Sequence, residues 1–362
     1  MKILFIMQTI RARGAERVAS ILSGQLADMS HDVYLICTGF ERGDEYPISK
    51  NVYLDFIPDA SGSRLHLMFV RIRYIRRKIK EIKPDCIISL AHARTCFMIT
   101  AAHVGIPVPM IFSERHDPVH NPKSKVDRLL RLICYRVCDR IVFQTEGAKD
   151  FFSSAISQKG TIIANPVKED LPAAWNEVRK PIIATFCKLD PQKNLSMLLH
   201  AFHKLADEYP DLRLAIYGDG PLRRALEQEA EQLGILSRTE FHPHSLDVHA
   251  QVKDCAMFVS SSDYEGQSNS MLEAMAMGLP CVCTDCPCGG ARAVIDNGVN
   301  GLLVPVGDAE KLVEAMRYML THPEEAQRMG ENAAKIKDER RPRKIAEEWD
   351  RLIRETVSQA RT

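Results

Sequence analysis

The chain has 362 residues, with 48 Lys and Arg against 47 Asp and Glu, so its formal net charge is +1. Hydrophobic residues make up 45% and charged residues 26%, which is typical of a globular protein with a sizeable core. The length predicts two domains, and the composition excludes a disordered chain, a coiled coil, a small disulfide scaffold and a uniformly basic nucleic-acid binder.

Short apolar runs alternate with helical stretches along the chain. The strands expected in the first half are 3–7, 33–37, 86–90, 110–112 and 141–144. Those expected in the second half are 182–186, 212–217, 240–242, 257–260, 280–284 and 301–304. The clearest helical stretches are 15–27, 64–83, 194–208, 221–233 and 270–277. This alternation predicts an α/β protein whose parallel sheets are covered on both faces.

The strand–helix series occurs twice, and residues 165–179 interrupt it with Asn165-Pro166 and Pro172. We therefore predict two Rossmann-like, doubly wound domains, 1–168 and 169–340. A charged helix over 341–362 is expected to pack back on the N-terminal domain. Residues 1–170 carry 25 Lys and Arg against 18 Asp and Glu, whereas the remainder carries 23 against 29. The near-zero net charge thus conceals a basic N-terminal half and an acidic C-terminal half.

The basic excess is concentrated in residues 64–83, where Glu81 is the single acidic residue. Apolar residues recur there at helical spacing, so the segment is predicted to be a basic amphipathic helix, which can lie on an anionic membrane surface. The alternative is a solvated helix whose apolar stripe packs on its own sheet. We expect the stripe to pack inward and leave a basic face for phosphates of the membrane or of an acceptor diphosphate, formed by Arg71, Arg73, Arg76, Arg77, Lys78 and Lys80.

The 11 cysteines are odd in number and scattered, which does not indicate a disulfide framework. Four of them have the spacing C-x-C-x2-C-x-C, namely Cys281, Cys283, Cys286 and Cys288. We interpret the first pair as part of a buried strand rather than as zinc ligands, because zinc sites more often pair C-x2-C units across a longer gap. No secretory signal or apolar run of about 20 residues is visible, so a cytoplasmic protein with reduced thiols is expected.

Residues 263–278 carry the strongest chemical signal. The polar loop Glu265-Gly266-Gln267-Ser268-Asn269 follows the strand 257–260, and a helix is expected to begin near Ser270 with Glu273 in its first turn. The free amides and dipole of a helix N-terminus form a natural seat for a phosphate or a sugar hydroxyl. The alternative is an ordinary helix N-terminus with a favourable acidic residue.

Three further strand–helix turns carry charged or glycine residues. Lys188 and Lys193 follow the strand 182–186, where ligands of open α/β sheets bind and where lysines can neutralise a diphosphate; exposed loop lysines are the alternative. Gly218-Asp219-Gly220 is only a fragment of the dinucleotide fingerprint. Arg13-Gly14-Ala15-Glu16-Arg17 leads into the first helix, and Gly14 allows close approach of an anionic group.

Taken in chain order, from Gly14 through Lys188 and Gly218 to Glu265, the four motifs are similar to those of a known family. The chain resembles GT-B glycosyltransferases of family 4, retaining enzymes that use nucleotide sugars, over essentially its whole length. The most specific element is Glu265…Glu273 with the segment 274–280 that follows it. The resemblance extends to bacterial enzymes that build polyprenyl-diphosphate-linked glycans and surface polysaccharides. It implies the GT-B fold, in which two Rossmann-like domains face each other across a cleft.

The resemblance also implies roles for individual residues. Glu273 corresponds to the residue that binds the ribose, Glu265 to the one that binds donor-sugar hydroxyls, and Lys193 to the lysine that contacts the diphosphate. Lys188 stands where the family usually has Arg, and Arg13 replaces the first glycine of the family's G-G-A-E-R turn. The implied nucleotide-sugar-binding residues are Gly14, Lys188, Lys193, His244, Glu265, Gly266, Gln267, Ser268, Asn269 and Glu273.

A family histidine reaches the donor sugar from the N-terminal domain. In Ser113-Glu114-Arg115-His116-Asp117-Pro118 the candidate is His116, and a shift of one residue would favour Arg115. The implied catalytic residues are therefore Glu265, His116 and Lys193. Positioned cations can replace a divalent metal in stabilising the departing diphosphate, so no metal and no other cofactor are expected. No protein nucleophile is assigned, with Glu265 as the alternative.

The sequence thus predicts a retaining, metal-independent transferase. It would move a sugar, an N-acetylhexosamine by resemblance, from a UDP-sugar to a polyprenyl-diphosphate-linked glycan or another glycan acceptor. The enzyme is expected to be peripheral on the inner face of the cell membrane and to bind no nucleic acid. The competing hypotheses are a sugar-nucleotide epimerase on a similar fold and a non-catalytic, membrane-associated nucleotide-binding protein. An NAD-dependent oxidoreductase is disfavoured because no full G-x-G-x-x-G follows either first strand.

Overall fold

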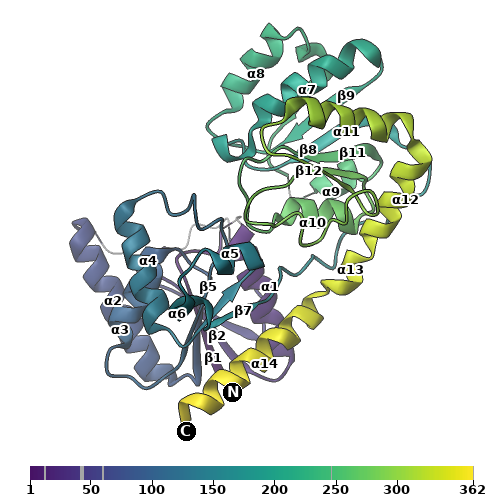
Figure 1. The fold of residues 1–362 in the computed structure, drawn as a ribbon. Helices are drawn as coiled ribbons and strands as arrows, with labels where there is room; N and C mark the ends of the chain where they lie inside the picture. The colour runs from purple at the N-terminus through teal and green to yellow at the C-terminus, as the bar shows by residue number, and fades with distance from the viewer. Residues whose placement is uncertain (12–13, 41–44, 59–60, 246, 362) are drawn as a thin grey trace. The chain divides into compact units, whose positions relative to one another are not determined.

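The computed structural model describes residues 1–11, 14–40, 45–58, 61–245 and 247–361, which form two compact units (Figure 1). The N-terminal unit contains Met1–Pro166 together with Pro342–Thr362, and the C-terminal unit contains Val167–Arg341. The chain passes from one unit to the other at Pro166, within the segment where prolines interrupt the sequence pattern. The last helix returns to the first unit.

The N-terminal unit is built on a parallel sheet of seven strands within the described residues. In spatial order the strands are β3 (Val52–Phe56), β2 (Asp32–Cys37), β1 (Lys2–Met7), β4 (Cys86–Ser89), β5 (Met110–Ser113), β6 (Arg140–Phe143) and β7 (Gly160–Ile162). Its helices are α1 (Gly14–Asp28), α2 (Arg64–Ile82), α3 (Ala93–His103), α4 (Lys125–Val137), α5 (Glu146–Asp150), α6 (Ser154–Ser157) and α14 (Pro342–Arg361).

The C-terminal unit is built on a parallel sheet of six strands within the part described. Their spatial order is β10 (Thr239–His242), β9 (Arg213–Tyr217), β8 (Lys180–Phe186), β11 (Cys255–Ser260), β12 (Cys281–Thr284) and β13 (Leu302–Val304). The helical elements are η1 (Pro191–Lys193), α7 (Leu195–Glu208), α8 (Arg223–Gln232), η2 (Leu236–Arg238), α9 (Val248–Val252), α10 (Asn269–Ala276), α11 (Ala309–Thr321), α12 (Pro323–Ala334) and α13 (Ile336–Glu339).

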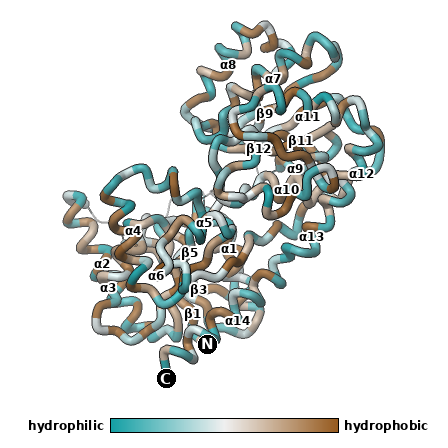
Figure 2. The backbone as a smooth tube through the Cα atoms, viewed as in Figure 1, coloured by the Kyte–Doolittle hydropathy of each residue, from teal (hydrophilic) through white to brown (hydrophobic). Residues whose placement is uncertain are grey.

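Both faces of the C-terminal sheet are buried, as β12 shows. Cys281 and Cys283 pack in one hydrophobic cluster, whereas Val282 packs in the cluster on the opposite face. Because successive side chains of a strand point to opposite faces, this arrangement requires apolar residues at every position. The hydropathy colouring follows the same rule, since the tube is brown along β11 (Figure 2). Cys281 and Cys283 thus serve the core as small apolar groups.

The predicted fold class is confirmed, because each unit is a doubly wound parallel sheet. The expected strands and helices are present within a few residues of their predicted ends. Two strands were missed, β3 and β7, which form the two edges of the N-terminal sheet. Tyr53 in β3 is exposed and β7 is only three residues long, so neither gives a clear apolar run.

Helix α14 belongs to the core of the N-terminal unit. It packs along α1, and Ile345, Trp349 and Ile353 are buried in the same hydrophobic cluster as β1 and β2. Hydrophilic residues on its other face give α14 an alternating pattern of colour (Figure 2). The helix is also held by polar contacts, because His31 Nε2 lies 2.9 Å from Asp350 Oδ1. The last helix is therefore a structural part of the first unit.

His31 makes the docking of α14 sensitive to pH. Burial lowers its pKa below the usual 6.5, the nearby N-terminus and Arg354 act in the same direction, and Asp350 opposes them. The folded protein therefore binds fewer protons than the unfolded chain, and this contribution to stability is complete above about pH 6.5 and lost as the pH falls below it. We expect the melting temperature to fall more steeply between pH 7.5 and 5.5 in the wild type than in His31→Gln. Equal slopes would contradict this.

Candidate active site

The order of strands in the C-terminal sheet reverses between β8 and β11, which are neighbours in the centre. Ligands of open α/β sheets bind at such a point, beyond the carboxyl ends of the strands, because the following loops diverge there. The loop after β8 carries Lys188 and Lys193, and the loop after β11 carries Glu265. The topology therefore brings together two motifs that are far apart in the sequence.

Lys193 and Glu265 form an ion pair between these two loops. Lys193 Nζ lies 2.6 Å from Glu265 Oε2, and Gln192 Nε2 donates to the same oxygen at 3.0 Å. Burial alone would lower the pKa of Lys193, but the Glu265 carboxylate outweighs burial and raises it above the usual value. Lys193 is thus held as a cation at the carboxyl end of the sheet.

A network of hydrogen bonds joins the backbones of the two loops behind this pair. Asn194 caps α7 by accepting from the Met197 amide, and its Nδ2 donates to Asp263 Oδ1 at 2.7 Å. Ser261 Oγ donates to the Lys193 carbonyl at 2.9 Å, and the Asp263 amide donates to the Gln192 carbonyl at 2.9 Å. Because each loop is tied to the other, the positions of Lys193 and Glu265 are fixed by the scaffold.

Helix α10 begins beside Lys193. Ser268 is its N-cap and accepts from the Met271 amide. Lys193, Ser268 and Ser270 line one small cavity, together with Thr185 and residues 260–262. A cation and a helix N-terminus that face the same cavity both favour an anion there. Gly266 and Gln267 are buried in the loop that leads to this helix, and Asn269 is half-buried at its first position.

Glu273 is buried in α10, and its partner is a residue that sequence reasoning missed. His249 Nε2 lies 3.0 Å from Glu273 Oε2, and the edge of the His249 ring meets Phe186. His249 belongs to α9, a helix of only five residues with no recognisable motif. Its proximity to Glu273 depends on tertiary packing, and nothing in the local sequence indicates it.

Lys188 and His244 lie apart from the ion pair. Lys188 is exposed, and its Nζ lies 3.3 Å from Asp190 Oδ2. His244 is also exposed, and its backbone amide donates to Asp219 Oδ2 at 3.0 Å. The short loop Gly218-Asp219-Gly220 packs against the backbone of the Lys188 loop, because a Cβ at Gly220 would lie 2.1 Å from the Leu189 carbonyl oxygen. Glycine is required there for packing between loops.

Arg115 is the most unusual candidate in the N-terminal unit. It follows β5, is only 8% exposed, and none of its three guanidinium nitrogens has a hydrogen-bond partner among the residues that the structure describes. Burial lowers its pKa to about 9, so it is still charged at neutral pH. The adjacent carboxylate cannot neutralise it, because Glu114 pairs with Arg131 at 3.1 Å and also accepts from Tyr135.

His116 is half-buried, and its ring stacks on that of His92 at 5.3 Å between centroids. His92 precedes α3, at the end of β4, so the stack joins the ends of two central strands. Gly14 is the first residue of α1. Arg13, which was expected to alter this turn, lies outside the described residues.

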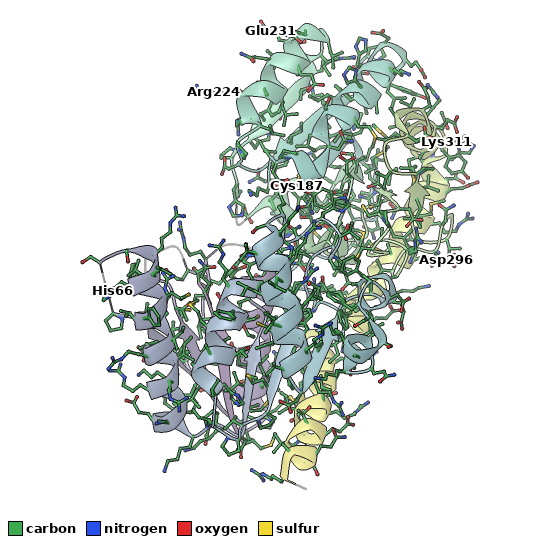
Figure 3. The ribbon with its side chains drawn as sticks, turned by 60° about the vertical axis from the view of Figure 1, so that its left-hand side comes forward. His66, Cys187, Arg224, Glu231, Asp296 and Lys311 are labelled. Carbon is green, nitrogen blue, oxygen red and sulfur yellow. The ribbon has the colours of Figure 1, made fainter. Side chains whose placement is uncertain are left out.

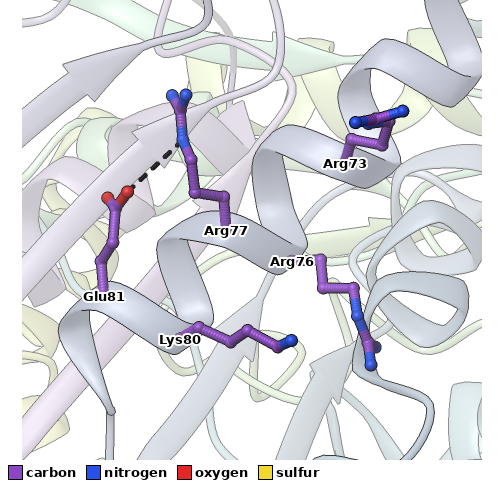
Figure 4. A pocket seen from close by; sticks show the side chains of 5 residues that line it. All are labelled: Arg73, Arg76, Arg77, Lys80 and Glu81. Carbon is purple, nitrogen blue, oxygen red and sulfur yellow. Dashed lines mark ion pairs between the residues drawn. The ribbon is translucent and has the colours of Figure 1, made fainter.

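The basic face predicted on α2 is present, although part of it is engaged. Ile75 and Ile79 are buried, whereas Leu65 and Phe69 of the same apolar stripe are 68% and 60% exposed, so only the second half of the stripe packs inward as expected. Arg73, Arg76, Arg77, Lys80 and Glu81 line an open pocket (Figure 4). Arg76 Nη1 donates to the carbonyls of Ala102 and Val104 at the end of α3, and Lys78 pairs with Asp55. Arg71 is half-buried, whereas Arg73 and Lys80 are exposed.

Charged side chains elsewhere lie on the outer surface of the units. His66 projects from the first turn of α2, and Arg224 and Glu231 project from α8 (Figure 3).

Among the described residues, no group of three or more His, Cys, Asp or Glu side chains is arranged to hold a metal ion. No helix in the described ranges is long and apolar enough to cross a membrane.

Residues 167–336 match the family model described as "Glycosyl transferases group 1", and residues 12–171 match the one described as "Glycosyltransferase Family 4". The chain belongs to this group of glycosyltransferases. Together the two matches reach across both units, and the GT-B fold predicted from the sequence is confirmed.

Relatives and solved structures agree with this assignment. The chain is 25% identical to an uncharacterized glycosyltransferase of Haemophilus influenzae, over 96% of this chain and 98% of the relative. It is 26% identical to a Campylobacter jejuni α-1,4-N-acetyl-D-galactosaminyltransferase that acts on a glycan linked to diphospho-undecaprenol, over 98% and 99%. The crystal structure of Anabaena HepE with UDP and glucose superposes with a TM-score of 0.83 at 17% identity, over 98% of this chain and 100% of HepE.

Gly290 supports the Glu265 loop from behind, and sequence reasoning missed it. A Cβ at this position would lie 1.6 Å from the Gly266 carbonyl oxygen, so the backbone of Gly290 packs directly on that loop. Any larger residue must therefore displace the backbone at Gly266 and Gln267. The sequence Cys288-Gly289-Gly290 predicts a tight turn, but it does not indicate that this turn packs against the Glu265 loop.

We expect Gly290→Ala to lower kcat/KM about 100-fold, because a shift of about 1 Å in a positioned group has an effect of that size. Because the clash is with backbone atoms, the melting temperature should fall as well, so the kinetics are measured well below it. The control is Gly24→Ala in the N-terminal unit, because the added Cβ would lie 3.3 Å from its nearest neighbour, the Cβ of Ser49. Wild-type donor kinetics in Gly290→Ala would show that the loop does not depend on this contact.

Proposed function

We propose that the chain is a retaining glycosyltransferase that uses a UDP-sugar and elongates a polyprenyl-diphosphate-linked glycan in bacterial glycan biosynthesis. The observation that carries the proposal is the placement of Lys193, paired with Glu265, beside the N-terminus of α10. A half-buried cation and a helix dipole in one cavity match the needs of a leaving diphosphate.

The reaction follows from where charge develops. Breaking the bond between the anomeric carbon and the phosphate oxygen leaves negative charge on the UDP diphosphate. Lys193 and the free amides of α10 are fixed before the reaction, so they stabilise this charge without reorganising. Lys188, exposed on the same loop, would add a second cation. Glu265 is placed to accept hydrogen bonds from donor-sugar hydroxyls once the sugar lies beside Lys193.

Retention requires the acceptor to attack from the face that the diphosphate leaves. A double displacement by Glu265 would also retain configuration, but its carboxylate is neutralised by Lys193 and accepts from Gln192 as well. Such a carboxylate is a weak nucleophile. We therefore propose front-face attack, with the departing phosphate oxygen taking the proton of the acceptor hydroxyl.

Metal independence belongs to the same proposal. The diphosphate of a nucleotide sugar carries two negative charges. The ammonium of Lys193 has three N–H donors and can bind a phosphate oxygen while it stays paired with Glu265, and Lys188 and the helix N-terminus add positive charge. In this arrangement Lys193 and Lys188 take the place that a divalent cation occupies in metal-dependent transferases. Full activity in the presence of excess EDTA is the result that the proposal requires.

The acceptor and the sugar are proposed from relatives. Two C. jejuni relatives transfer N-acetylgalactosamine to glycans on diphospho-undecaprenol, and the Anabaena structures hold UDP, UDP-glucose or UDP with glucose. We propose a UDP-N-acetylhexosamine donor and a lipid-linked acceptor for this chain. The exposed cations of α2, chiefly Arg73 and Lys80, would then attract acceptor or membrane phosphates at the cytoplasmic face.

Arg115 is proposed to bind a substrate phosphate on the N-terminal unit. Burying a guanidinium without a hydrogen-bond partner costs free energy in the unliganded protein. Charge-assisted hydrogen bonds to a bound anion would offset that cost. This makes Arg115 a stronger candidate than His116 for a contact with a substrate phosphate. His116, stacked on His92, is then the candidate for binding sugar hydroxyls.

The test of the proposed function is a panel of nucleotide sugars with and without a polyprenyl-diphosphate acceptor, followed by product mass. We expect transfer only with the acceptor. Lys193→Met should lower kcat/KM by about 100-fold or more, and Lys188→Met by about tenfold, because Lys193 is the fixed cation. Donor isomerisation without an acceptor would indicate an epimerase, and UDP-sugar binding with no turnover would indicate a non-catalytic protein.

For Arg115→Met we expect opposite changes in stability and activity. Removing the buried charge should raise the free energy of unfolding by about 1–3 kcal/mol, while kcat/KM falls by at least tenfold. Arg131→Met is the matched control: it removes the partner of Glu114 and should destabilise the protein. If Arg115→Met is destabilised as well, Arg115 has a structural role.

A further inference from the structure

Helix α4 displays an apolar stripe that is open to solvent. Val126 is 62% exposed, Leu129 59%, Ile133 39% and Val137 54%. Their spacing of three, four and four residues places them in one line along the whole of α4. Figure 1 shows where this helix lies on the N-terminal unit. Exposed apolar residues that form a continuous line are rare on a soluble protein and mark an interaction surface.

The stripe is separate from the face that holds α4 in the fold. Arg131, Cys134 and Tyr135 are buried on the opposite side, and Ser124 caps the N-terminus of the helix. The helix is therefore fully anchored without the four exposed side chains. Their apolar character has no explanation in the packing of the unit itself.

The charges beside the stripe indicate the nature of its partner. Lys125 and Arg136 are exposed on α4, and Lys123 is exposed just before it. Asp127 is the single acidic residue of the helix, and it is half-buried and paired with Arg94. The solvent-facing charge of α4 is thus entirely positive. A complementary partner must be apolar at its centre and negative at its edge.

We infer that α4 lies in the interface of a lipid bilayer, with the stripe among the acyl chains and its basic residues against anionic headgroups. A second copy of this chain is a poor occupant, since a two-fold dimer through α4 would bring Lys125 and Arg136 close to the same residues of the partner subunit. Amphipathic helices with an apolar face and a flanking row of Lys and Arg bind anionic membranes in this manner.

Helix α3 packs against both α2 and α4, so the three helices form one layer of the N-terminal unit. The sequence pointed to α2 as the membrane helix, and Leu65 and Phe69 at its start are exposed, but its central apolar residues are buried in the fold. The continuous apolar line is on α4, so the inference assigns insertion chiefly to α4 and leaves α2 a chiefly electrostatic part. The inference deepens the proposal that the chain acts at a membrane and rests on the proposed function for its biological meaning. Its test is independent of that function, because vesicle binding can be measured without transferase activity.

The experiment is co-sedimentation of the full chain with phosphatidylcholine vesicles and with vesicles that contain phosphatidylglycerol. We expect binding to the anionic vesicles, and a loss of about tenfold or more in the partition coefficient for Leu129→Gln/Ile133→Gln. These side chains are exposed, so the variant should keep the wild-type melting temperature. The matched control is Leu236→Gln/Val299→Gln in the C-terminal unit, where the exposed fractions are 40% and 49%.

Activity on a short-chain acceptor in detergent should be equal in the wild type and the α4 variant, whereas activity on an acceptor embedded in vesicles should fall with vesicle binding. Equal vesicle binding by the wild type, the α4 variant and the control variant would overturn the inference. A wild-type dimer in sedimentation equilibrium that Leu129→Gln/Ile133→Gln dissociates would overturn it as well, because the occupant would then be a second copy. If the wild type and its variants all lack transferase activity but vesicle binding follows the prediction, the proposed function fails and the inference about α4 stands.

Discussion

The ion pair between Lys193 and Glu265 is the interaction on which the candidate site depends. Each partner leaves the sheet on a different loop, and the reversal of strand order between β8 and β11 brings those loops together. A lysine in a half-buried position needs a carboxylate to remain charged in a small cavity. The pair therefore keeps a cation ready for an anionic ligand, and the hydrogen bonds of Asn194 and Ser261 hold it in place.

The two units contribute different chemistry. In the C-terminal unit, Lys193 is held by a preorganised network of hydrogen bonds, which suits the binding of an anionic ligand. The N-terminal unit holds Arg115 without a partner among the described residues and exposes apolar and basic side chains on α4 and α2. These features stabilise the free protein poorly, and they are intelligible if ligands or a membrane surface complete them.

Much of the fold was predictable, because buried parallel strands are continuous apolar runs and the turns between them carry Gly, Pro and charged residues. The missed strands β3 and β7 are edges, where burial no longer imposes that pattern. In the site, Lys193 and Glu265 were predictable as separate motifs through the family resemblance. Their contact was not, since 72 residues separate them. His249, Gly290 and the exposure of α4 depend on tertiary packing alone, which local sequence does not encode.

The most direct test of the central claim is a double-mutant cycle on donor binding, with Lys193→Met, Glu265→Gln and the combined variant measured by calorimetry with the UDP-sugar. If the pair acts as one unit, each single change leaves the other group without its partner. The combined variant should then bind no more weakly than the worse single variant, with a coupling energy of about 1–3 kcal/mol. Additive losses would show that Lys193 and Glu265 act independently and would contradict the account.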